Sequence, residues 1–335
     1  MTAVAARRAA APSSSPQSSS PQASPSTPSA GTRKSASAAA LRWRTPMLFL
    51  APFLLLFIGM YVLPIAFAIA QSLFTLKRDG LGLTAPTLNF DPLANYARVF
   101  GDTEFTASLG RVLLFGVVQV PVMMILAGGL ALLFDSSLVK AKRLFQFAVF
   151  LPYAVPGVIA ALLWGFLYQP AVSPVIQFLA SIGIEANLLA PGTVLWAIAN
   201  ISIWSYTGIN MIILFAALQS VPREMYEAAR LDGADELRIA WSIKIPMIWP
   251  AFLLTTLSSI IGTLQLFSEP AVLKTITPNI SSDFTPNMAV FSAATLGNNA
   301  NLSSAMAVIL GVATLVVSLV IMRVTNRRNG ASRDA

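Results

Sequence analysis

The chain has 335 residues and a net charge of +8; 56% of its residues are hydrophobic and only 11% are charged. Soluble domains carry about 25% charged residues, so this composition excludes an ordinary soluble core. Because the chain contains neither Cys nor His, it has no disulfide, no thiolate nucleophile and no histidine to act as general base or metal ligand. The basic residues cluster at the ends of apolar segments, which indicates membrane topology rather than nucleic-acid binding.

Residues 1–46 form the first segment, which is rich in Ala, Ser and Pro and has no acidic residue. Such a composition buries too little apolar surface to offset the entropy of ordering, and we expect a disordered, basic cytoplasmic tail. A transit peptide is also rich in Arg and Ser, but the many prolines disfavour its amphipathic helix. The basic residues of the tail are Arg7, Arg8, Arg33, Lys34, Arg42 and Arg44.

Six apolar segments follow, each with about the twenty residues that cross a hydrocarbon core of roughly 30 Å. Lipid cannot satisfy exposed backbone groups, so each segment must be helical. The third segment contains Pro152, Pro156 and Gly157, which predict a kink or a broken turn. The predicted fold class is an all-α polytopic membrane protein with six transmembrane helices. The segments are 47–76, 108–134, 144–168, 192–218, 247–268 and 304–325.

The distribution of charge predicts the orientation of these helices. With the N-terminus in the cytoplasm, the inside segments carry 17 Lys and Arg residues and the outside segments carry five. The positive-inside rule then places both termini in the cytoplasm. The expected organisation is the tail 1–46, a six-helix membrane domain over 47–325 and a cytoplasmic C-terminal tail over 326–335.

Polar side chains interrupt the fourth and fifth segments near the middle of the membrane. Such groups face either a cavity or a neighbouring helix, and Asn200, Trp204 and Thr207 share one helical face. Amide groups beside aromatic rings suit a neutral sugar, whereas the lack of a buried cation suits phosphate poorly. The predicted substrate path consists of Asn200, Trp204, Tyr206, Thr207, Asn210, Ser259, Thr263 and Gln265.

A charged island lies between the fourth and fifth segments. It reads Glu227-Ala228-Ala229-Arg230-Leu231-Asp232-Gly233 and, nine residues later, Ile243-Lys244-Ile245-Pro246. Pro222 suits the first turn of a helix and Gly233 its end, and a second helix is expected from about Asp235 to Lys244, where Pro246 breaks it. The small alanines allow a partner to approach closely, although a solvated amphipathic loop is the alternative.

The chain contains no G-x-x-x-x-G-K-[ST] loop, so it cannot hold nucleotide phosphates in the way an ATPase does. Proton-driven carriers depend on acidic or histidine relays within the membrane. We place no acidic residue inside the six segments, with Glu269 at the outer end of the fifth. Proton coupling is therefore disfavoured, whereas sodium coupling through backbone carbonyls remains open.

The charged island resembles the "EAA" loop of the membrane subunits of bacterial ABC importers, with Ile245 in place of the usual Leu. Within that class the chain is similar to permeases of the carbohydrate-uptake branch, the maltose and glycerol-3-phosphate type. The resemblance extends over about residues 47–325 and excludes the basic tail. Its further phrases are Asn95-Tyr96 with Phe100, Phe150-Leu151-Pro152 with Trp164 and Pro170, Thr207-Gly208, and Leu218 to Pro222.

The resemblance implies a type I importer architecture in a bacterial plasma membrane, with no cofactor, no metal and no catalysis by this chain. The implied partners are a second homologous permease, two ATP-binding subunits and an extracytoplasmic solute-binding protein that delivers a sugar. Force from the ATPases would enter through residues 219–246. The residues implied to receive it are Glu227, Ala228, Ala229, Arg230, Asp232, Gly233, Ile243 and Pro246.

Two other functions compete with this interpretation. One is a stand-alone secondary carrier or channel for a small neutral solute, and the other is a membrane assembly factor without a translocation path. The identity of the sugar, transport of glycerol 3-phosphate and the choice between a heterodimer and a homodimer stay open at the level of sequence.

Overall fold

The computed structural model describes residues 36–77, 87–136, 139–183 and 185–331. Most of the predicted tail, up to residue 35, therefore lies outside the described residues. The chain divides into two units, Met1–Ile58 and Gly59–Ala335. In the first unit, helix α1 (Ala36–Phe57) begins before residue 47, the predicted start of the first apolar segment, and accommodates two prolines, Pro46 and Pro52.

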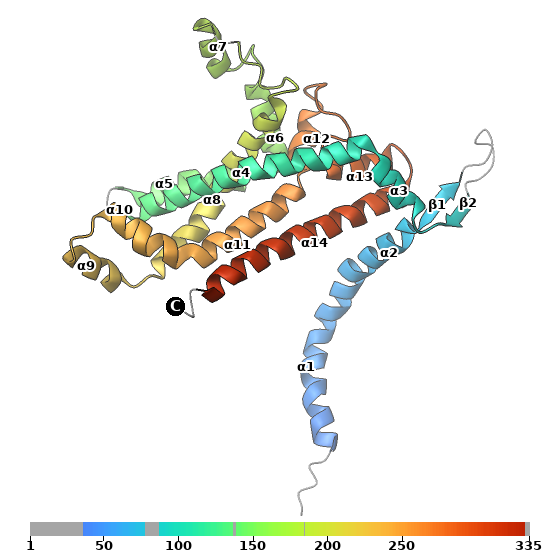
Figure 1. Cartoon of the computed structure of the whole chain (residues 1–335), viewed down its shortest axis with the longest axis horizontal. Coiled ribbons are helices and arrows are strands. Elements are labelled where there is room, and N and C mark those ends of the chain that lie inside the picture. Colours follow the sequence, from blue (N-terminus) through green and yellow to red (C-terminus); the bar gives the residue numbers. More distant parts are fainter. Residues whose placement is uncertain (1–35, 78–86, 137–138, 184, 332–335) are drawn as a thin grey trace, which may run out of the picture. The chain divides into compact units, whose positions relative to one another are not determined.

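The second unit is almost entirely helical (Figure 1). A π-helical turn, η1 (Ile58–Val62), joins it to α1. Its further elements in chain order are α2 (Leu63–Ser72), β1 (Phe74–Lys77), β2 (Thr87–Phe90), α3 (Ala94–Gly101), α4 (Thr103–Asp135), α5 (Lys142–Phe150), η2 (Leu151–Ala154), α6 (Gly157–Leu167), α7 (Pro174–Ser181), α8 (Val194–Gln219), α9 (Arg223–Leu231), α10 (Glu236–Ile239), η3 (Ala240–Lys244), α11 (Ile245–Leu264), α12 (Ser268–Leu273), α13 (Pro286–Thr295) and α14 (Ala300–Ala331).

The predicted six-helix membrane fold is confirmed. Five helical stretches of the described chain are long and apolar enough to span a bilayer, and a bent pair supplies the sixth. In that pair, Lys142–Ala154 and Gly157–Leu167 meet at 97°, at the point where Pro152, Pro156 and Gly157 predict a break. The five continuous stretches are Pro46–Ser72, Thr103–Asp135, Val194–Gln219, Glu236–Leu273 and Ala300–Arg323.

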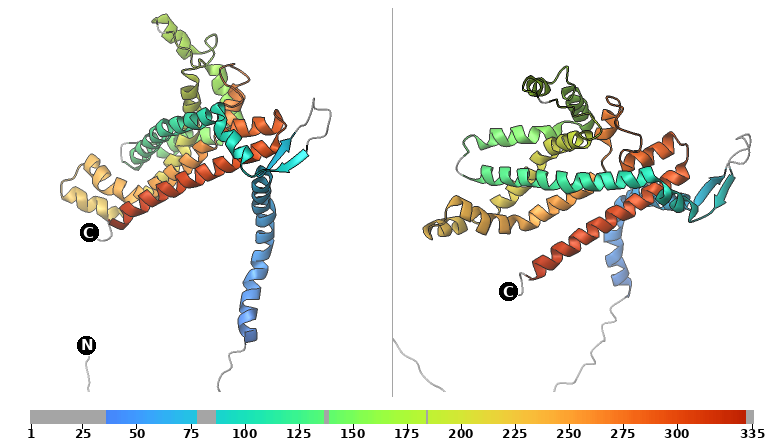
Figure 2. Two further views of the ribbon diagram at one scale, coloured as in Figure 1. Left: turned by 45° about the vertical axis from the view of Figure 1, so that its right-hand side comes forward. Right: turned by 45° about the horizontal axis from the view of Figure 1, so that its top comes forward.

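The helices α4, α8 and α11 pack together around one cluster of buried apolar side chains (Figures 1 and 2). Ala127 and Ala131 of α4 are completely buried against Met211 and Leu214 of α8. Small residues spaced by one helical turn let two helices approach closely, which is how helices gain dispersion energy where lipid offers no hydrophobic driving force. This packing also determines how far apart the polar side chains of α4, α8 and α11 lie from one another.

Hydrogen bonds from the Asn95-Tyr96 phrase join the end of α2 to the start of α3. The buried Asn95 amide donates to the carbonyl oxygens of Ser72 at 2.9 Å and Phe74 at 2.8 Å. The Tyr96 hydroxyl lies 2.7 Å from the Ser72 hydroxyl. These bonds satisfy carbonyls that the end of α2 leaves free and position the antiparallel hairpin of β1 and β2.

One predicted break is wrong. Pro246 does not interrupt the chain before the fifth membrane segment, because α10, η3 and α11 form one continuous helical stretch, Glu236–Leu273 being a single candidate span. The π-helical turn η3 directly precedes Pro246, which occupies the first turn of α11. A π-helical turn alters the local hydrogen-bond pattern, and a proline in a first turn lacks only an N–H group that the helix does not need.

The predicted C-terminal tail is also helical as far as Ala331.

Gly208 marks the closest approach between α8 and the broken third segment. A Cβ at this position would overlap the carbonyl oxygen of Val149 and lie 2.8 Å from the Cα atom of Phe150. Because both contacts are with backbone, no side-chain rotation relieves them. We expect Gly208→Ala to lower the stability of the purified protein by about 1–3 kcal/mol, the range typical of overpacking, measured as a fall in its thermal unfolding midpoint.

Gly129→Ala is the matched control, since a Cβ at Gly129 meets nothing within 4 Å. An equal unfolding midpoint for the two variants would contradict the close approach at Gly208.

Candidate functional site

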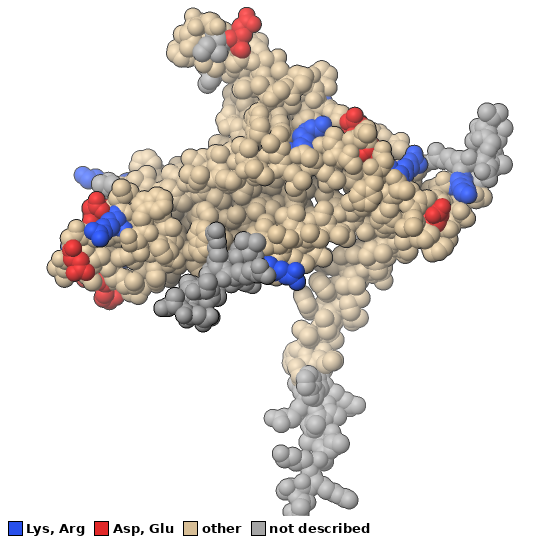
Figure 3. Space-filling view, in the orientation of Figure 1, with Lys and Arg blue, Asp and Glu red and all other residues tan. Residues whose placement is uncertain are grey.

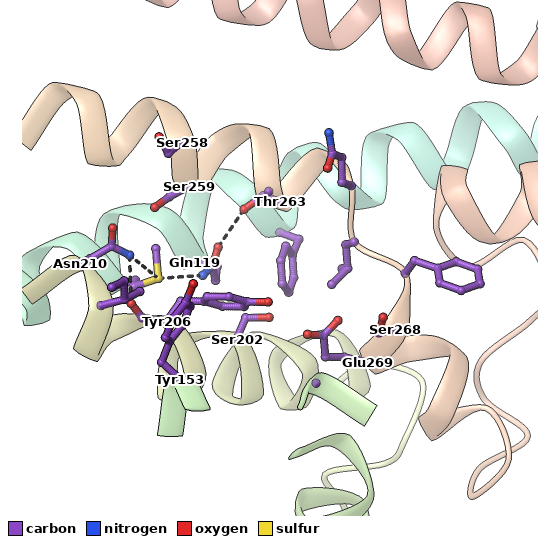
Figure 4. A pocket seen from close by; sticks show the side chains of 18 of the residues that line it. Gln119, Tyr153, Ser202, Tyr206, Asn210, Ser258, Ser259, Thr263, Ser268 and Glu269 are labelled. Carbon is purple, nitrogen blue, oxygen red and sulfur yellow. Dashed lines mark hydrogen bonds between the residues drawn. The ribbon is translucent and has the colours of Figure 1, made fainter. Parts of the chain in front are cut away.

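A cavity of about 500 Å³ lies between α4, α8, α11 and the connection that leads into α12. The break in the third segment adds Tyr153 and Gly157 to its wall. Figure 4 shows Ser258, Ser259 and Thr263 along the α11 side, with Tyr153, Tyr206 and Ser202 facing them. The polar lining consists of Gln119, Tyr153, Ser202, Tyr206, Asn210, Ser258, Ser259, Thr263, Gln265, Ser268 and Glu269.

Five of the eight residues predicted for the substrate path line this cavity: Tyr206, Asn210, Ser259, Thr263 and Gln265. They come from α8, from α11 and from the residue that follows α11. The structure thus brings together side chains that lie more than fifty residues apart in the chain.

The other three predicted residues lie outside the cavity lining and take part in helix packing. The Asn200 amide donates to the Tyr168 hydroxyl at 2.8 Å, and the ring of Trp204 lies edge-on to Trp164 at 5.8 Å. The Thr207 hydroxyl donates to the Ile203 carbonyl one turn earlier at 2.6 Å. The contacts of Asn200 and Trp204 fit the alternative of hydrogen bonding and packing between helices, whereas the Thr207 bond stays within α8.

Several residues that line the cavity are not among those predicted for the substrate path. Gln119 is the clearest case. It is a polar residue within the second apolar segment, and this polarity could have marked it as facing a cavity or another helix. Tyr153 follows the first proline of the broken segment, and Ser202 lies among the polar residues of α8 without having been selected. Their convergence on one cavity depends on how three helices pack, which no local pattern reports.

The amide nitrogens of Gln119 and Asn210 share one weak acceptor. The Gln119 nitrogen lies 3.5 Å from the Met123 sulfur and the Asn210 nitrogen 3.7 Å from it, although Asn210 also donates to the Tyr206 carbonyl at 3.0 Å. A thioether is a poor acceptor, so a ligand hydroxyl can replace it at little cost. The Gln119 oxygen accepts a hydrogen bond from Thr263 at 3.1 Å, which positions that amide (Figure 4).

Glu269 is placed differently from the prediction. It was expected at the outer end of the fifth segment, whereas the candidate span continues to Leu273 and includes it. The helix α11 ends at Leu264, and a new helix, α12, begins at Ser268. This change of direction places Glu269 in the wall of the cavity, where 7% of its surface is exposed.

The charged island forms two short helices, α9 and α10, as its residues predict. Leu231 is the last residue of α9, and Gly233 has a φ of +82°, a conformation that L-residues rarely adopt. The Asp235 side chain then accepts a hydrogen bond from the Arg238 amide at 2.8 Å and begins α10. The stop predicted at Gly233 is therefore confirmed.

Charged side chains gather over α9 and α10, whereas the surface over the long helices is nearly free of charge (Figure 3). Glu227, Ala228, Arg230 and Asp232 are exposed and Ala229 is half-buried. Arg230 pairs with Glu236 at 2.6 Å, which links α9 to α10 on the surface. Further along the chain, Ile243 is half-buried and Pro246 is exposed.

A buried ion pair joins the two short helices to the membrane core. The Lys244 ammonium lies 2.6 Å from an oxygen of Asp135 at the end of α4, and their side chains are 5% and 11% exposed. Gln219 at the end of α8 also donates to Asp135, at 2.9 Å. The ends of α4, α8 and η3 therefore meet at one carboxylate.

Tyr226 of α9 packs against this cluster. Its ring lies 5.2 Å from the Lys244 ammonium, and burial, followed by the negative charge of Asp135, raises the pKa of its hydroxyl. The phenol stays neutral at physiological pH, and its ring fixes the position of α9 relative to Lys244.

A bundle of apolar helices around a polar cavity, with an exposed charged helix pair at one end, defines a membrane transport subunit. The chain belongs to the family of binding-protein-dependent transport system inner membrane components. The sequence model of this family matches residues 124–328.

Relatives with known names support this membership. The lactose transport system permease protein LacF of Rhizobium radiobacter is 35% identical over 227 residues, which cover 66% of this chain and 73% of the relative. The sn-glycerol-3-phosphate transport system permease protein UgpA of Agrobacterium fabrum is 30% identical over 227 residues, covering 66% and 74%. A solved bacterial ABC transporter involved in the import of the acidic polysaccharide alginate shares the fold, with a TM-score of 0.71, 20% identity and coverage of 87% of this chain and 98% of that one.

The buried pair predicts that two substitutions, Lys244→Met and Arg230→Gln, differ greatly in their effect on stability. Lys244→Met leaves Asp135 charged, buried and without its cation, and breaking a buried pair in this way costs about 3–5 kcal/mol. We expect a clear fall in the thermal unfolding midpoint of the purified protein, and partial recovery in the double variant Asp135→Asn with Lys244→Met.

Arg230→Gln serves as the control, because it breaks an ion pair whose side chains are 52% and 43% exposed. Exposed pairs contribute about 0–1 kcal/mol, so its midpoint should stay near that of the wild type. Additive effects in the double variant would contradict direct coupling between Asp135 and Lys244.

Proposed function

We propose that this chain is the permease subunit of an ATP-driven importer that carries a carbohydrate across the bacterial inner membrane. The observation that carries the proposal is the exposed helix pair α9 and α10 in a chain of the binding-protein-dependent family. Such a subunit has no catalytic role of its own, and ATP hydrolysis takes place in partner chains.

The surface of the helix pair supports docking of an ATP-binding subunit. Large apolar side chains stand exposed among its charges: Leu231 is 89% exposed, and Leu237 and Trp241 are each 67% exposed. Apolar groups of this size that face water and are rimmed by charges mark a protein interaction site. Glu227, Arg230 and Asp232 then offer charges for pairing, and Ala228 allows close approach of the partner backbone.

The buried ion pair supports a route for force into the membrane core. A push on α9 reaches Tyr226 and Lys244 and, through the carboxylate of Asp135, the end of α4. Both α4 and α11 line the cavity, so movement of α9 and α10 would change the shape of the cavity. This is the shear and hinge movement that switching transporters use.

The cavity supports a sugar as the substrate. Its hydroxyl and amide groups match the hydroxyls of a saccharide, and Tyr153 and Tyr206, whose ring centres lie 6.1 Å apart, offer apolar faces. The lactose permease among the relatives agrees with this chemistry. A solute-binding protein would deliver the sugar to the outer side, and a second homologous permease, in a heterodimer, would complete the pore with two ATP-binding subunits below it.

The orientation follows from the charge distribution, with both termini and the pair α9 and α10 in the cytoplasm. The outer side then carries the hairpin of β1 and β2, together with α7, α12 and α13.

Gly233→Val tests the coupling role of α9. Valine cannot adopt the φ of +82° without strain, so the connection between α9 and α10 must change shape. We expect uptake by cells that express the whole importer to fall by about tenfold or more, which corresponds to about 1.4 kcal/mol or more of lost coupling, with ATP hydrolysis uncoupled from transport or the complex unassembled.

Gly183→Val is the matched control, because Gly183 has a φ of +83° and follows α7, outside the proposed coupling loop. It carries the same backbone strain and should leave ATP hydrolysis coupled to uptake. Wild-type uptake by the Gly233→Val variant would sink the assignment of α9 as the coupling helix.

The energy source is tested in vesicles that contain the complete importer. We expect accumulation of a saccharide bound by the partner solute-binding protein only when ATP is present. Accumulation by this chain alone, driven by a sodium or proton gradient, would instead establish the secondary carrier.

A further inference from the structure

Glu269 is the one charged side chain among the residues that line the cavity, all of which are described. It lies in α12 and closes the cavity at the end opposite Asn210 (Figure 4). Gly157 faces it without a side chain, and a Cβ there would be in ordinary van der Waals contact with a Glu269 carboxylate oxygen, at 3.5 Å.

No cation of the described residues pairs with this carboxylate. The ion pairs in the described part of the chain involve Arg230, Glu236, Lys244 and Asp135, and none involves Glu269. A buried carboxylate inside a candidate membrane span is costly, which makes Glu269 a candidate functional group. Low-dielectric walls around a single negative charge focus its field, which raises the local concentration of cations, lowers that of anions and leaves that of uncharged ligands unchanged.

The rest of the lining is neutral and mixed in its hydrogen-bonding capacity. Ser202, Ser259 and Gln265 offer donors and acceptors, whereas the Glu269 carboxylate only accepts. An ionised acceptor forms hydrogen bonds roughly twice as strong as a neutral one, so it holds the hydroxyls of an uncharged sugar well. A ligand phosphate or carboxylate would meet the same group as a like charge.

We propose that Glu269 determines specificity, so that the cavity accepts uncharged saccharides and rejects anionic ones such as sugar phosphates and uronates. This inference rests on the proposed function of the cavity as a sugar path. It separates this chain from two of its similar proteins, whose names refer to glycerol 3-phosphate and to an acidic polysaccharide.

The absence of cysteine from the chain provides a direct test. Ser259→Cys places a single thiol in the cavity wall, and the assembled importer is treated with methanethiosulfonate reagents that carry either a trimethylammonium or a sulfonate group. Labelling of this chain is followed by its intact mass, so cysteines of partner chains do not interfere. After correction for reaction with a free thiol, we expect the cationic reagent to react about tenfold faster.

Glu269→Gln should reduce this preference about threefold or more by removing the focused charge, whereas Glu269→Asp should retain it. Asp283→Asn, which removes an acid from the connection between α12 and α13 and outside the cavity lining, should also leave it unchanged. A purely structural role for Glu269 would lower the unfolding midpoint of Glu269→Gln without moving the ratio of the two rates. An unchanged ratio in Glu269→Gln, or equal rates in the wild type, would overturn the proposal.

The substrate class is tested with the same thiol. Lactose should slow labelling by the uncharged reagent methyl methanethiosulfonate more than glycerol 3-phosphate does, and Glu269→Gln should reduce the difference. Equal protection by lactose and glycerol 3-phosphate in the wild type would overturn the rejection of anions. Protection by neither compound, together with no ATP-dependent sugar uptake, would contradict the proposed function while the charge preference of the cavity still stood.

Discussion

The absence of water from the hydrocarbon core is the constraint on which the rest of this structure depends. Every polar group placed at that depth must find a partner in the protein or face a cavity. The structure meets this condition in two ways. Asn200 and Thr207 bond to neighbouring protein groups, whereas Tyr206, Ser259 and Gln265 border the cavity between α4, α8 and α11. The same constraint that makes the segments helical therefore also places polar side chains around a cavity.

Charge is used differently at the helix pair and in the cavity. At the end formed by α9 and α10, the buried charges of Lys244 and Asp135 neutralise each other at 2.6 Å. Such a pair stabilises a single arrangement of helix ends, because separating it leaves two uncompensated charges. Inside the cavity Glu269 has no such partner among the described residues. We propose that the paired charge provides a mechanical connection and that the unpaired charge selects the solute.

Glycine contributes in three different physical ways. At Gly208 it permits contact between α8 and the backbone of Val149, and at Gly157 it leaves the cavity wall beside Glu269 without a side chain. At Gly233 it supplies a backbone conformation that ends α9. Only the last role follows from local chain properties, which is why it could be predicted from the sequence, whereas the first two depend on which helices become neighbours.

The amino-acid sequence by itself determined the number and approximate bounds of the membrane helices, the break at Pro152 to Gly157 and the short helix that ends just before Gly233. These features follow from hydrophobic length, from missing N–H groups and from permitted dihedral angles, all of which are local. The tertiary structure alone decided which polar residues share a cavity, so that Tyr206 faces it while Trp204 packs against Trp164. It also decided that Pro246 continues a helix and that Glu269 lies in a wall rather than at a membrane surface. The reason is that helix rotation and the restart of the chain at α12 are set by packing between distant segments, which no window of the sequence contains.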